Sequence, residues 1–413
     1  VVVGGVRRSA LISLSNLTDE RMRNAKKGQW WIDTPEMALS NNSVCYTEKP
    51  DIGIFMKEWL SLYESKSGER GIFNRQAAIK QVARTERRDT EHEFGCNPCS
   101  EVVVRESDKQ KDILRKVRLA TILGTFQASL TNLRRLRKKW VINTEEEALL
   151  GVSLTGIMDN SFMNGSYRDR GVSEFHGNLS LPDFLIKLKK ESVKINKEWS
   201  ESLGINPSTS ITAIKPSGTV SQLVNSASGI HPRHNDYYLR RVRADVKDPI
   251  AQLMKDEGIP CEPDVTKPDS VEVFTFPMKA PEGAVLRDDR TAIEQLELWL
   301  TYQRYYCEHK PSITISVKEH EWMEVGAWVY ENFDEVSGVS FLPHSDHSYQ
   351  QAPYEDCTEG VYLEALGGMP DAVNWSRIEE YELTDTTKGM KTMACTGNVC
   401  EMVDLTDEDG DME

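Results

Sequence analysis

The sequence predicts an α/β protein built on a mainly parallel sheet or barrel with helices on its outside. From residue 210 onward, short apolar runs typical of strands alternate with helical patterns, and such alternation favours parallel strands joined by covering helices. The 413 residues are 39% hydrophobic and 28% charged, which fits one large folded domain or two to three smaller ones.

The first half of the chain is predicted to begin with a strand and to continue mainly as helices. We expect a strand at 1–15 and helices at 52–65, 75–87, 112–140 and 185–199. In the longest of these, apolar residues such as Ile113, Leu123 and Leu130 keep a spacing close to three and four, so one side of this helix should be buried. Thr144 and Glu147 are predicted to form the capping box of the following helix.

The second half carries the strand-and-helix alternation. Strands are expected at 210–214, 271–276, 313–317 and 339–342, and helices from 217, at 291–307 and at 319–332. Beyond about Thr384 the chain turns polar and ends in an acidic run. We therefore divide it into a folded α/β part, 1–383, and a mobile tail, 384–413.

Charge and cysteine content limit the possible functions. The sum of 50 Lys and Arg against 65 Asp and Glu is −15, which argues against general nucleic-acid binding. No apolar run is long enough to span a membrane, and eight cysteines without a secretion signal suit a reducing cytoplasm. The opening run Val1–Val6 lacks an initiator Met and reads as a buried strand, so we interpret the chain as the C-terminal part of a longer protein.

The sharpest local motif is the loop Gly95–Glu101. In an extended segment alternate side chains share a face, so Asn97, Cys99 and Glu101 would place an amide, a thiol and a carboxylate together. This set suits radical or acid/base chemistry on a sugar. Two alternatives remain open: a buried loop with a chance cysteine, or a redox or zinc pair formed by Cys96 and Cys99.

A second motif is the turn that follows the expected strand at 210–214. Pro216, Ser217, Gly218 and Thr219 stand at a predicted helix start, where free backbone N–H groups can bind phosphate. Many turns of this composition bind nothing, and the P-loop pattern is absent. His231 and His234 are interpreted as structural residues, with zinc ligation as the weaker alternative.

The tail holds Cys395 and Cys400, five positions apart in an uncharged stretch. Two thiols on a mobile arm can form a disulfide and carry electrons from an outside reductant to a buried site. We prefer this shuttle to the alternative of two unrelated cysteines.

Together, the Asn97–Glu101 loop, the Pro216–Thr219 turn and the Cys395/Cys400 tail resemble the adenosylcobalamin-dependent (class II) ribonucleotide reductases, in their C-terminal catalytic-barrel portion. The likeness runs from residue 1 to about 403. Further strings that carry it are GVRRSA at 5–10, SNNSV at 40–44, GVSLTG at 151–156, EHKPS at 308–312 and QAPYE at 351–355.

The resemblance implies a ten-stranded α/β barrel, incomplete at its N-terminus, with the Cys99 loop at its centre. It implies adenosylcobalamin as cofactor, a thiyl radical on Cys99, proton transfer by Glu101 and binding of the ribose hydroxyls by Asn97. Pro216 to Thr219 would hold the phosphates of a ribonucleotide, with Asn42 and Ser43 as further substrate contacts. Thioredoxin would reduce Cys395 and Cys400, and a deoxynucleotide would act as effector.

One departure from the family pattern concerns the internal dithiol. The family has one of its cysteines upstream of the position of Val1 and the other shortly after the radical loop, whereas here no cysteine occurs between Cys99 and Cys261. We therefore expect this chain alone to turn over slowly or not at all, unless Cys45 or Cys96 replaces the missing thiols. One alternative is a non-catalytic fragment that binds nucleotide, or that binds a partner chain which supplies the missing N-terminal portion. The other alternative is the iron-dependent class of reductase.

Overall fold

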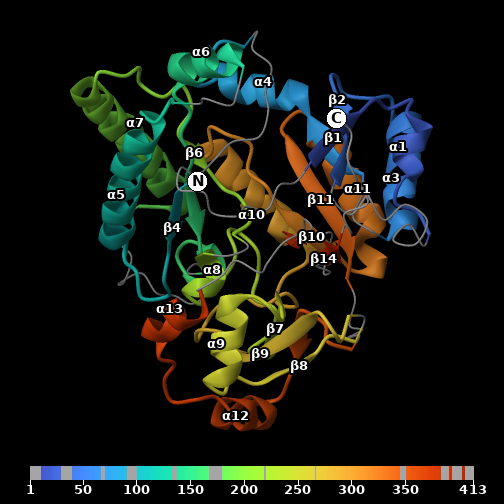
Figure 1. Cartoon of the computed structure of the whole chain (residues 1–413). Helices are drawn as coiled ribbons and strands as arrows, with labels where there is room; N and C mark the ends of the chain where they lie inside the picture. The colour runs from blue at the N-terminus through green and yellow to red at the C-terminus, as the bar shows by residue number, and fades with distance from the viewer. Residues whose placement is uncertain are drawn as a thin grey trace, which may run out of the picture.

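The computed structural model shows two mainly parallel sheets side by side, with helices outside them and an antiparallel lobe at one end (Figure 1). The structure describes residues 11–28, 40–66, 70–90, 100–132, 137–166, 179–217, 220–265, 267–344, 350–382, 390–392 and 402–404.

The larger sheet has five strands in the order β1-β2-β3-β11-β10. Its strands are β1 (Leu11–Ser15), β2 (Ser40–Tyr46), β3 (Gly71–Asn74), β11 (Gly338–Pro343) and β10 (Thr314–Val317). The first three are parallel to one another, β11 is antiparallel to β3, and β10 is parallel to β11. The sheet is therefore formed by two parallel groups that meet at one antiparallel junction.

The smaller sheet has the order β4-β5-β6, and all three strands are parallel. Its strands are β4 (Ser100–Val103), β5 (Val152–Thr155) and β6 (Thr212–Ala213). The amide of Ser312, just before β10, donates to the carbonyl of Ile214 at 2.9 Å, which joins the two sheets at β6 and β10. The mixed α/β architecture is confirmed, but the described strands do not confirm a ten-stranded barrel.

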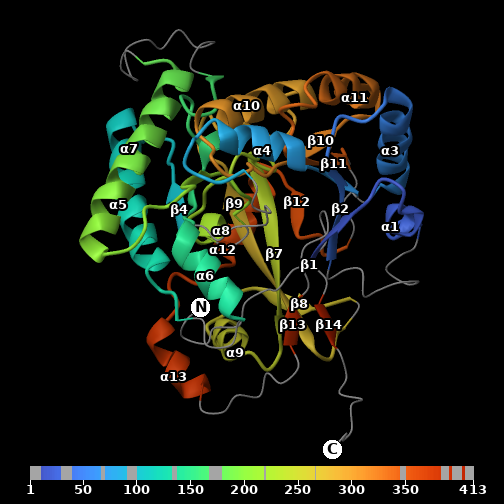
Figure 2. The ribbon, with the colours of Figure 1, turned by 90° about the horizontal axis from the view of Figure 1, so that it is seen from above.

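Helices cover the outer sides of both sheets (Figures 1 and 2). On the side of the smaller sheet lie α5 (Gln110–Ala128), α6 (Lys138–Glu147) and α7 (Leu181–Leu203); around the larger sheet lie α1 (Glu20–Asn24), α3 (Ile52–Ser65), α4 (Arg75–Ala83), α10 (Ala292–Tyr305) and α11 (Trp322–Glu331). Local sequence sets their ends: the Ser180 hydroxyl accepts from the Asp183 amide at the start of α7, and Gly204 ends that helix with φ of 68°.

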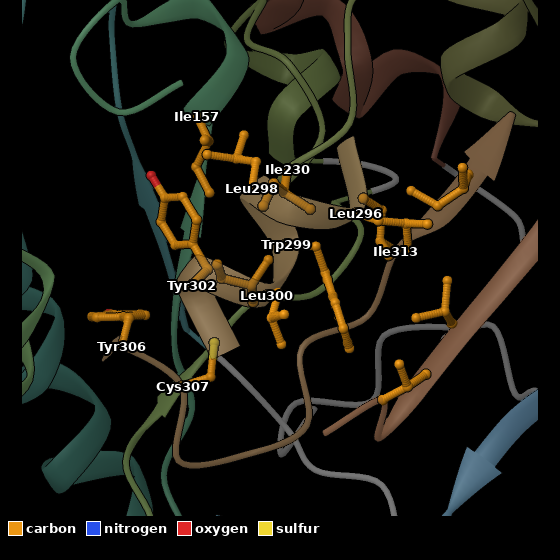
Figure 3. Packing of buried hydrophobic residues seen from close by; sticks show 14 of the residues in the cluster. Ile157, Ile230, Leu296, Leu298, Trp299, Leu300, Tyr302, Tyr306, Cys307 and Ile313 are labelled. Carbon is orange, nitrogen blue, oxygen red and sulfur yellow. The ribbon is translucent and has the colours of Figure 1, made fainter. Parts of the chain in front are cut away.

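Helix α10 forms the centre of the hydrophobic core, which Figure 3 shows from close by. Trp299, Tyr302 and Tyr306 are completely buried. The two tyrosines also fix their neighbours, because the Tyr302 hydroxyl donates to the Met163 carbonyl at 2.7 Å and the Tyr306 hydroxyl donates to the Val152 carbonyl at 2.9 Å. Helix α10 is thereby tied to the start of β5 and to the loop that follows it.

The lobe is a four-stranded antiparallel sheet, which the sequence analysis did not anticipate. It has the order β12-β7-β9-β8 and carries α9, α12 and α13. Its elements are β7 (Tyr237–Asp245), α9 (Pro249–Asp256), β8 (Cys261–Pro263), β9 (Val271–Lys279), β12 (Tyr354–Asp356), α12 (Glu359–Gly367) and α13 (Ile378–Tyr381). Strand β7 escaped prediction because most of its side chains are half-buried, so it shows no clear alternation of apolar and polar residues.

The single helix predicted at 112–140 is wrong, because α5 ends at Ala128 and α6 begins at Lys138. Leu123 and Leu130, expected to be buried, are 68% and 58% exposed. Ile113 is buried as expected, together with Val117, and the rest of the buried face carries the smaller residues Thr121, Gly124 and Thr125. Gly124 lies close to the Leu150 side chain. The predicted capping box is also wrong, since Thr144 and Glu147 lie in the last turns of α6.

Two further expectations concern the tail and membranes. Within 384–413 the structure describes only a short antiparallel pair, β13 (Met390–Thr392) with β14 (Met402–Asp404), so the mobile tail stays a prediction. Among the described helices, none combines the length and the apolar character that crossing a membrane requires.

Candidate functional site

The predicted phosphate turn follows β6, and its residue Ser217 is hydrogen-bonded to other residues of the chain. The Ser217 amide donates to the Ser228 hydroxyl at 2.9 Å, and the Ser217 hydroxyl accepts from the Ser221 amide at 2.9 Å. Pro216 has no N–H to offer. Pro216 and Ser217 therefore shape the turn, while Gly218 and Thr219 lie outside the described residues.

The segment 226–231 packs closely against this turn. Gly229 has φ of 58°, and a Cβ at this position would lie 2.6 Å from the Lys215 carbonyl oxygen. The Gly229 amide donates to the Thr155 hydroxyl at 2.7 Å, and that hydroxyl donates to the Ala227 carbonyl at 3.0 Å. Only glycine combines this backbone conformation with so close an approach, which fixes the segment between β5 and the turn.

His231 links this segment to β10. Its Nδ1 lies 2.9 Å from the Ser228 carbonyl, and its Nε2 lies 3.0 Å from the Thr314 amide nitrogen. Burial lowers the pKa of His231, and the bond to the Ser228 carbonyl partly offsets this. The ring is therefore held neutral, with both nitrogens bonded to the backbone.

A buried ion pair holds the other side of the same segment. Asp159, after β5, faces Arg233, with Oδ1 to Nε at 2.7 Å and Oδ2 to Nη2 at 2.8 Å, and the two side chains are 1% and 3% exposed. Asp159 also accepts from the Ala227 amide at 2.8 Å, and Arg233 donates to Asn225. This two-point charge-assisted pair was missed by sequence reasoning.

Strand β4 connects the predicted radical loop to the turn. Glu101 pairs with Ser153 on β5, which in turn pairs with Ala213 on β6. Two strand spacings separate the Glu101 backbone from that of Ala213, roughly 10 Å. Because the turn begins just after Ala213, Glu101 and the turn lie on the same small sheet.

The larger sheet presents small polar side chains on the face opposite its helices. On β2, Val44 and Tyr46 are buried, and Tyr46 packs edge-on against Phe333 beside α11. Strand alternation then puts Ser43 and Cys45 on the other face. A Cβ at Gly71 on β3 would lie 3.1 Å from the Ser43 hydroxyl and 3.0 Å from that of Ser340 on β11, so three small residues from three strands lie next to one another on this face.

This alternation separates two of the predicted substrate contacts. Asn42 is buried and lies on the same face of β2 as Val44 and Tyr46, whereas Ser43 lies on the opposite face with Cys45. Both remain predictions. The predicted residues Cys96, Asn97, Cys99, Cys395 and Cys400 lie outside the described ranges, and Glu101 is described only by its backbone.

The described part of the chain holds four cysteines and offers few metal ligands. Cys45, Cys261, Cys307 and Cys357 are free. Burial strongly raises the pKa of the Cys307 thiol, so this core cysteine is held protonated. Within the described ranges, no group of three or more His, Cys, Asp or Glu side chains could hold a metal ion; in particular, His231 bonds backbone groups through both ring nitrogens.

The fold is similar to that of a solved ribonucleotide reductase. A crystal structure of a B12-dependent (class II) ribonucleotide reductase matches with a TM-score of 0.65 at 19% sequence identity, over 91% of this chain and 55% of that chain. At this identity, the match establishes the fold alone.

Sequence comparison gives the particular relatives. The chain is 26% identical over 436 residues to the adenosylcobalamin-dependent ribonucleoside-triphosphate reductase of Lacticaseibacillus paracasei, covering 97% of this chain and 57% of the relative. It is 25% identical to the enzyme of the same name in Euglena gracilis, covering 97% of this chain and 54% of the relative. The predicted resemblance is confirmed, and the chain spans little more than half the length of these relatives. No protein-family model matches it.

Proposed function

We propose that the chain is the catalytic-barrel portion of a ribonucleotide reductase that converts ribonucleoside triphosphates to 2′-deoxyribonucleotides. The observation that carries this is the register of the smaller sheet, in which the backbones of Glu101 and of Ala213, three residues before the turn, lie about two strand spacings apart. That separation suits one nucleotide with its ribose near β4 and its phosphates at the turn.

In this reaction a thiyl radical on Cys99 removes the 3′ hydrogen atom of the ribose. Glu101 takes the 3′-hydroxyl proton, and Asn97 holds the hydroxyls. The 2′-hydroxyl leaves as water, and a dithiol supplies the two electrons and two protons that balance this loss, becoming a disulfide. Cys395 and Cys400 then reduce that disulfide and are themselves reduced by thioredoxin.

The phosphates are held at the turn. Ser217 sets its shape through bonds to Ser228 and Ser221, and Gly218 and Thr219 would contribute backbone N–H groups to the phosphates. Ser43, on the face of the larger sheet opposite its helices, is the better placed of the two further substrate candidates, and Asn42 is buried on the helix side of the same strand.

Adenosylcobalamin would be held at the face of the larger sheet that carries Ser43, Gly71 and Ser340, three small residues that lie next to one another. The cobalt needs no cluster of protein ligands there, because the corrin itself holds it. When bound, the cofactor supplies the radical that oxidises the Cys99 thiol. A deoxynucleotide effector and a cytoplasmic location complete the proposal.

The test is formation of deoxynucleotide from a ribonucleoside triphosphate with adenosylcobalamin and dithiothreitol. We expect activity when the upstream portion of a relative is added and Cys45 or Cys96 serves as the second dithiol cysteine, little from this chain alone, and none from Cys99→Ser. Turnover retained by Cys99→Ser would overturn the radical role.

A second candidate function follows from the partial span of 57%. A chain that binds nucleotide and a partner chain without turning over would act as a complementing fragment. Stable complex formation with an N-terminal piece, without deoxynucleotide product, would favour it. Product formed with iron in place of adenosylcobalamin would instead favour the iron-dependent class.

A further inference from the structure

A continuous line of hydrogen bonds runs from the phosphate turn to the larger sheet through one imidazole. The Ser217 amide donates to the Ser228 hydroxyl at 2.9 Å, the Ser228 carbonyl lies 2.9 Å from His231 Nδ1, and the Thr314 amide donates to His231 Nε2 at 3.0 Å. We infer that His231 is a positioning residue that sets the phosphate-binding geometry of the turn, an inference that rests on the proposed function.

The bonding partners determine the tautomer of this ring. A carbonyl can only accept, so Nδ1 must carry the proton that is donated to Ser228; a backbone amide can only donate, so Nε2 must be unprotonated to accept from Thr314. Both bonds require the same neutral form. A protonated ring would lose the Thr314 bond, and the burial that lowers the pKa of His231 favours the neutral form.

Ser228 is held both by its neighbours and by His231. Ala227 and Gly229 are bound by Asp159 and Thr155, which hold the segment against β5. The Ser228 carbonyl accepts from the His231 backbone amide at 2.9 Å and is also bonded to the His231 ring, which is anchored on β10. Removing the ring polarity would leave the backbone bond but break the link from Ser228 to β10, which loosens the Ser228 hydroxyl that accepts from the Ser217 amide.

His234 provides a matched control three residues later. Its Nε2 lies 3.0 Å from Asp356 on the lobe, and its ring packs against Tyr238 and Tyr354. It belongs to the same segment but makes no described bond to the turn. A change that merely loosens the segment should therefore affect both histidine variants, whereas a specific role in the turn should affect His231 alone.

The experiment measures binding of inorganic tripolyphosphate to the full chain by calorimetry, for the unmodified protein and for His231→Leu, His231→Asn and His234→Asn. Leu removes both bonds, and Asn keeps an N–H that can reach the Ser228 carbonyl. We expect roughly tenfold weaker binding for Leu, about threefold for Asn, and no change for His234→Asn, with melting temperatures recorded for each variant. Histidine-selective ¹⁵N NMR should show the Nδ1–H tautomer at neutral pH and a shift of the His231 signals when tripolyphosphate binds.

The outcomes distinguish a failure of the His231 inference from a failure of the proposed phosphate-binding role of the turn. If the unmodified chain binds tripolyphosphate and both His231 variants bind it equally well, the positioning role is wrong while the phosphate turn stands. An Nε2–H tautomer would also overturn it. If the unmodified chain binds no tripolyphosphate, the phosphate role of the turn fails as well. Should His231→Leu not fold, His231→Asn decides by the same criterion.

Discussion

Asp159 and Arg233, 74 positions apart in the chain, form a two-point ion pair that is almost completely buried. It joins the loop after β5 to the segment that leads into the lobe. Since Asp159 also accepts from the Ala227 amide, one carboxylate fixes both the arginine and the backbone beside the phosphate turn.

Asp159→Asn should therefore be strongly destabilising. The amide leaves the Arg233 charge buried without its counter-charge, which costs about 3–5 kcal/mol in the free energy of unfolding. Urea denaturation measures this. The matched control is Glu198→Gln, which breaks the exposed pair with Lys194 at 3.9 Å and should cost under about 1 kcal/mol. Equal losses in the two variants would contradict the role of burial.

Gly156 ends β5 in a conformation that no other residue can adopt there without strain. Its φ is 80°, and a Cβ would collide with the Val104 carbonyl. Gly156→Ala should cost at least about 3 kcal/mol of unfolding free energy. Gly165, with φ of 83° and its nearest neighbouring atom at 4.0 Å, serves as control, and Gly165→Ala should cost only about 1–2 kcal/mol. A similar melting temperature for both variants would argue against the close approach of β4.

Stability should fall as the solution becomes more acidic. Burial lowers the pKa of both His231 and His309 below the ordinary value of 6.5, so the unfolded chain binds more protons than the folded one in this range. The contribution of these histidines is then fully present above pH 6.5 and is lost as pH falls toward their folded pKa values.

Urea denaturation at several pH values measures this loss. His309→Gln can keep the bond that His309 Nε2 makes to the Leu150 carbonyl at 2.7 Å. In this variant the unfolding free energy should fall less steeply as the pH is lowered. The exposed His320 provides the control variant His320→Gln, whose profile should match that of the unmodified chain. An unchanged slope in His309→Gln would contradict the prediction.

The two sides of α5 should respond differently to truncation. Ile113 is completely buried, and Leu123 is 68% exposed. Ile113→Ala should cost about 2–5 kcal/mol, and Leu123→Ala under about 0.5 kcal/mol, as measured by thermal unfolding. Comparable losses of stability would indicate that Leu123 is buried, as the sequence periodicity predicted.

Local signals explain what the sequence predicted well. The helix expected at 52–65 is α3, and the helix expected at 185–199 lies within α7. Both could be predicted because helix caps and apolar periodicity depend on residues that are close in the sequence. The strand expected at 339–342 lies within β11. The face of α5 was misjudged since Gly124 and Thr125 pack closely where larger residues were expected.

Long-range relationships could not be predicted. Nothing near Asp159 in the sequence indicates Arg233 as its partner, and nothing near His231 indicates Thr314. The turn at Pro216 was identified by composition, yet the engagement of Ser217 by Ser228 depends on how the segment 226–231 folds back. Such contacts follow from tertiary packing, for which one sequence carries no direct signal.

The junction between β3 and β11 has a consequence for biosynthesis. Ile72 pairs with Val339, so β3 waits for a strand that is translated about 270 residues later. At the usual pace of translation, roughly 5–20 residues per second, the edge of β3 would stay uncovered on the ribosome for tens of seconds. Nascent chains should therefore depend on chaperones until β10 and β11 emerge, and the sheet should close slowly, as high contact order requires.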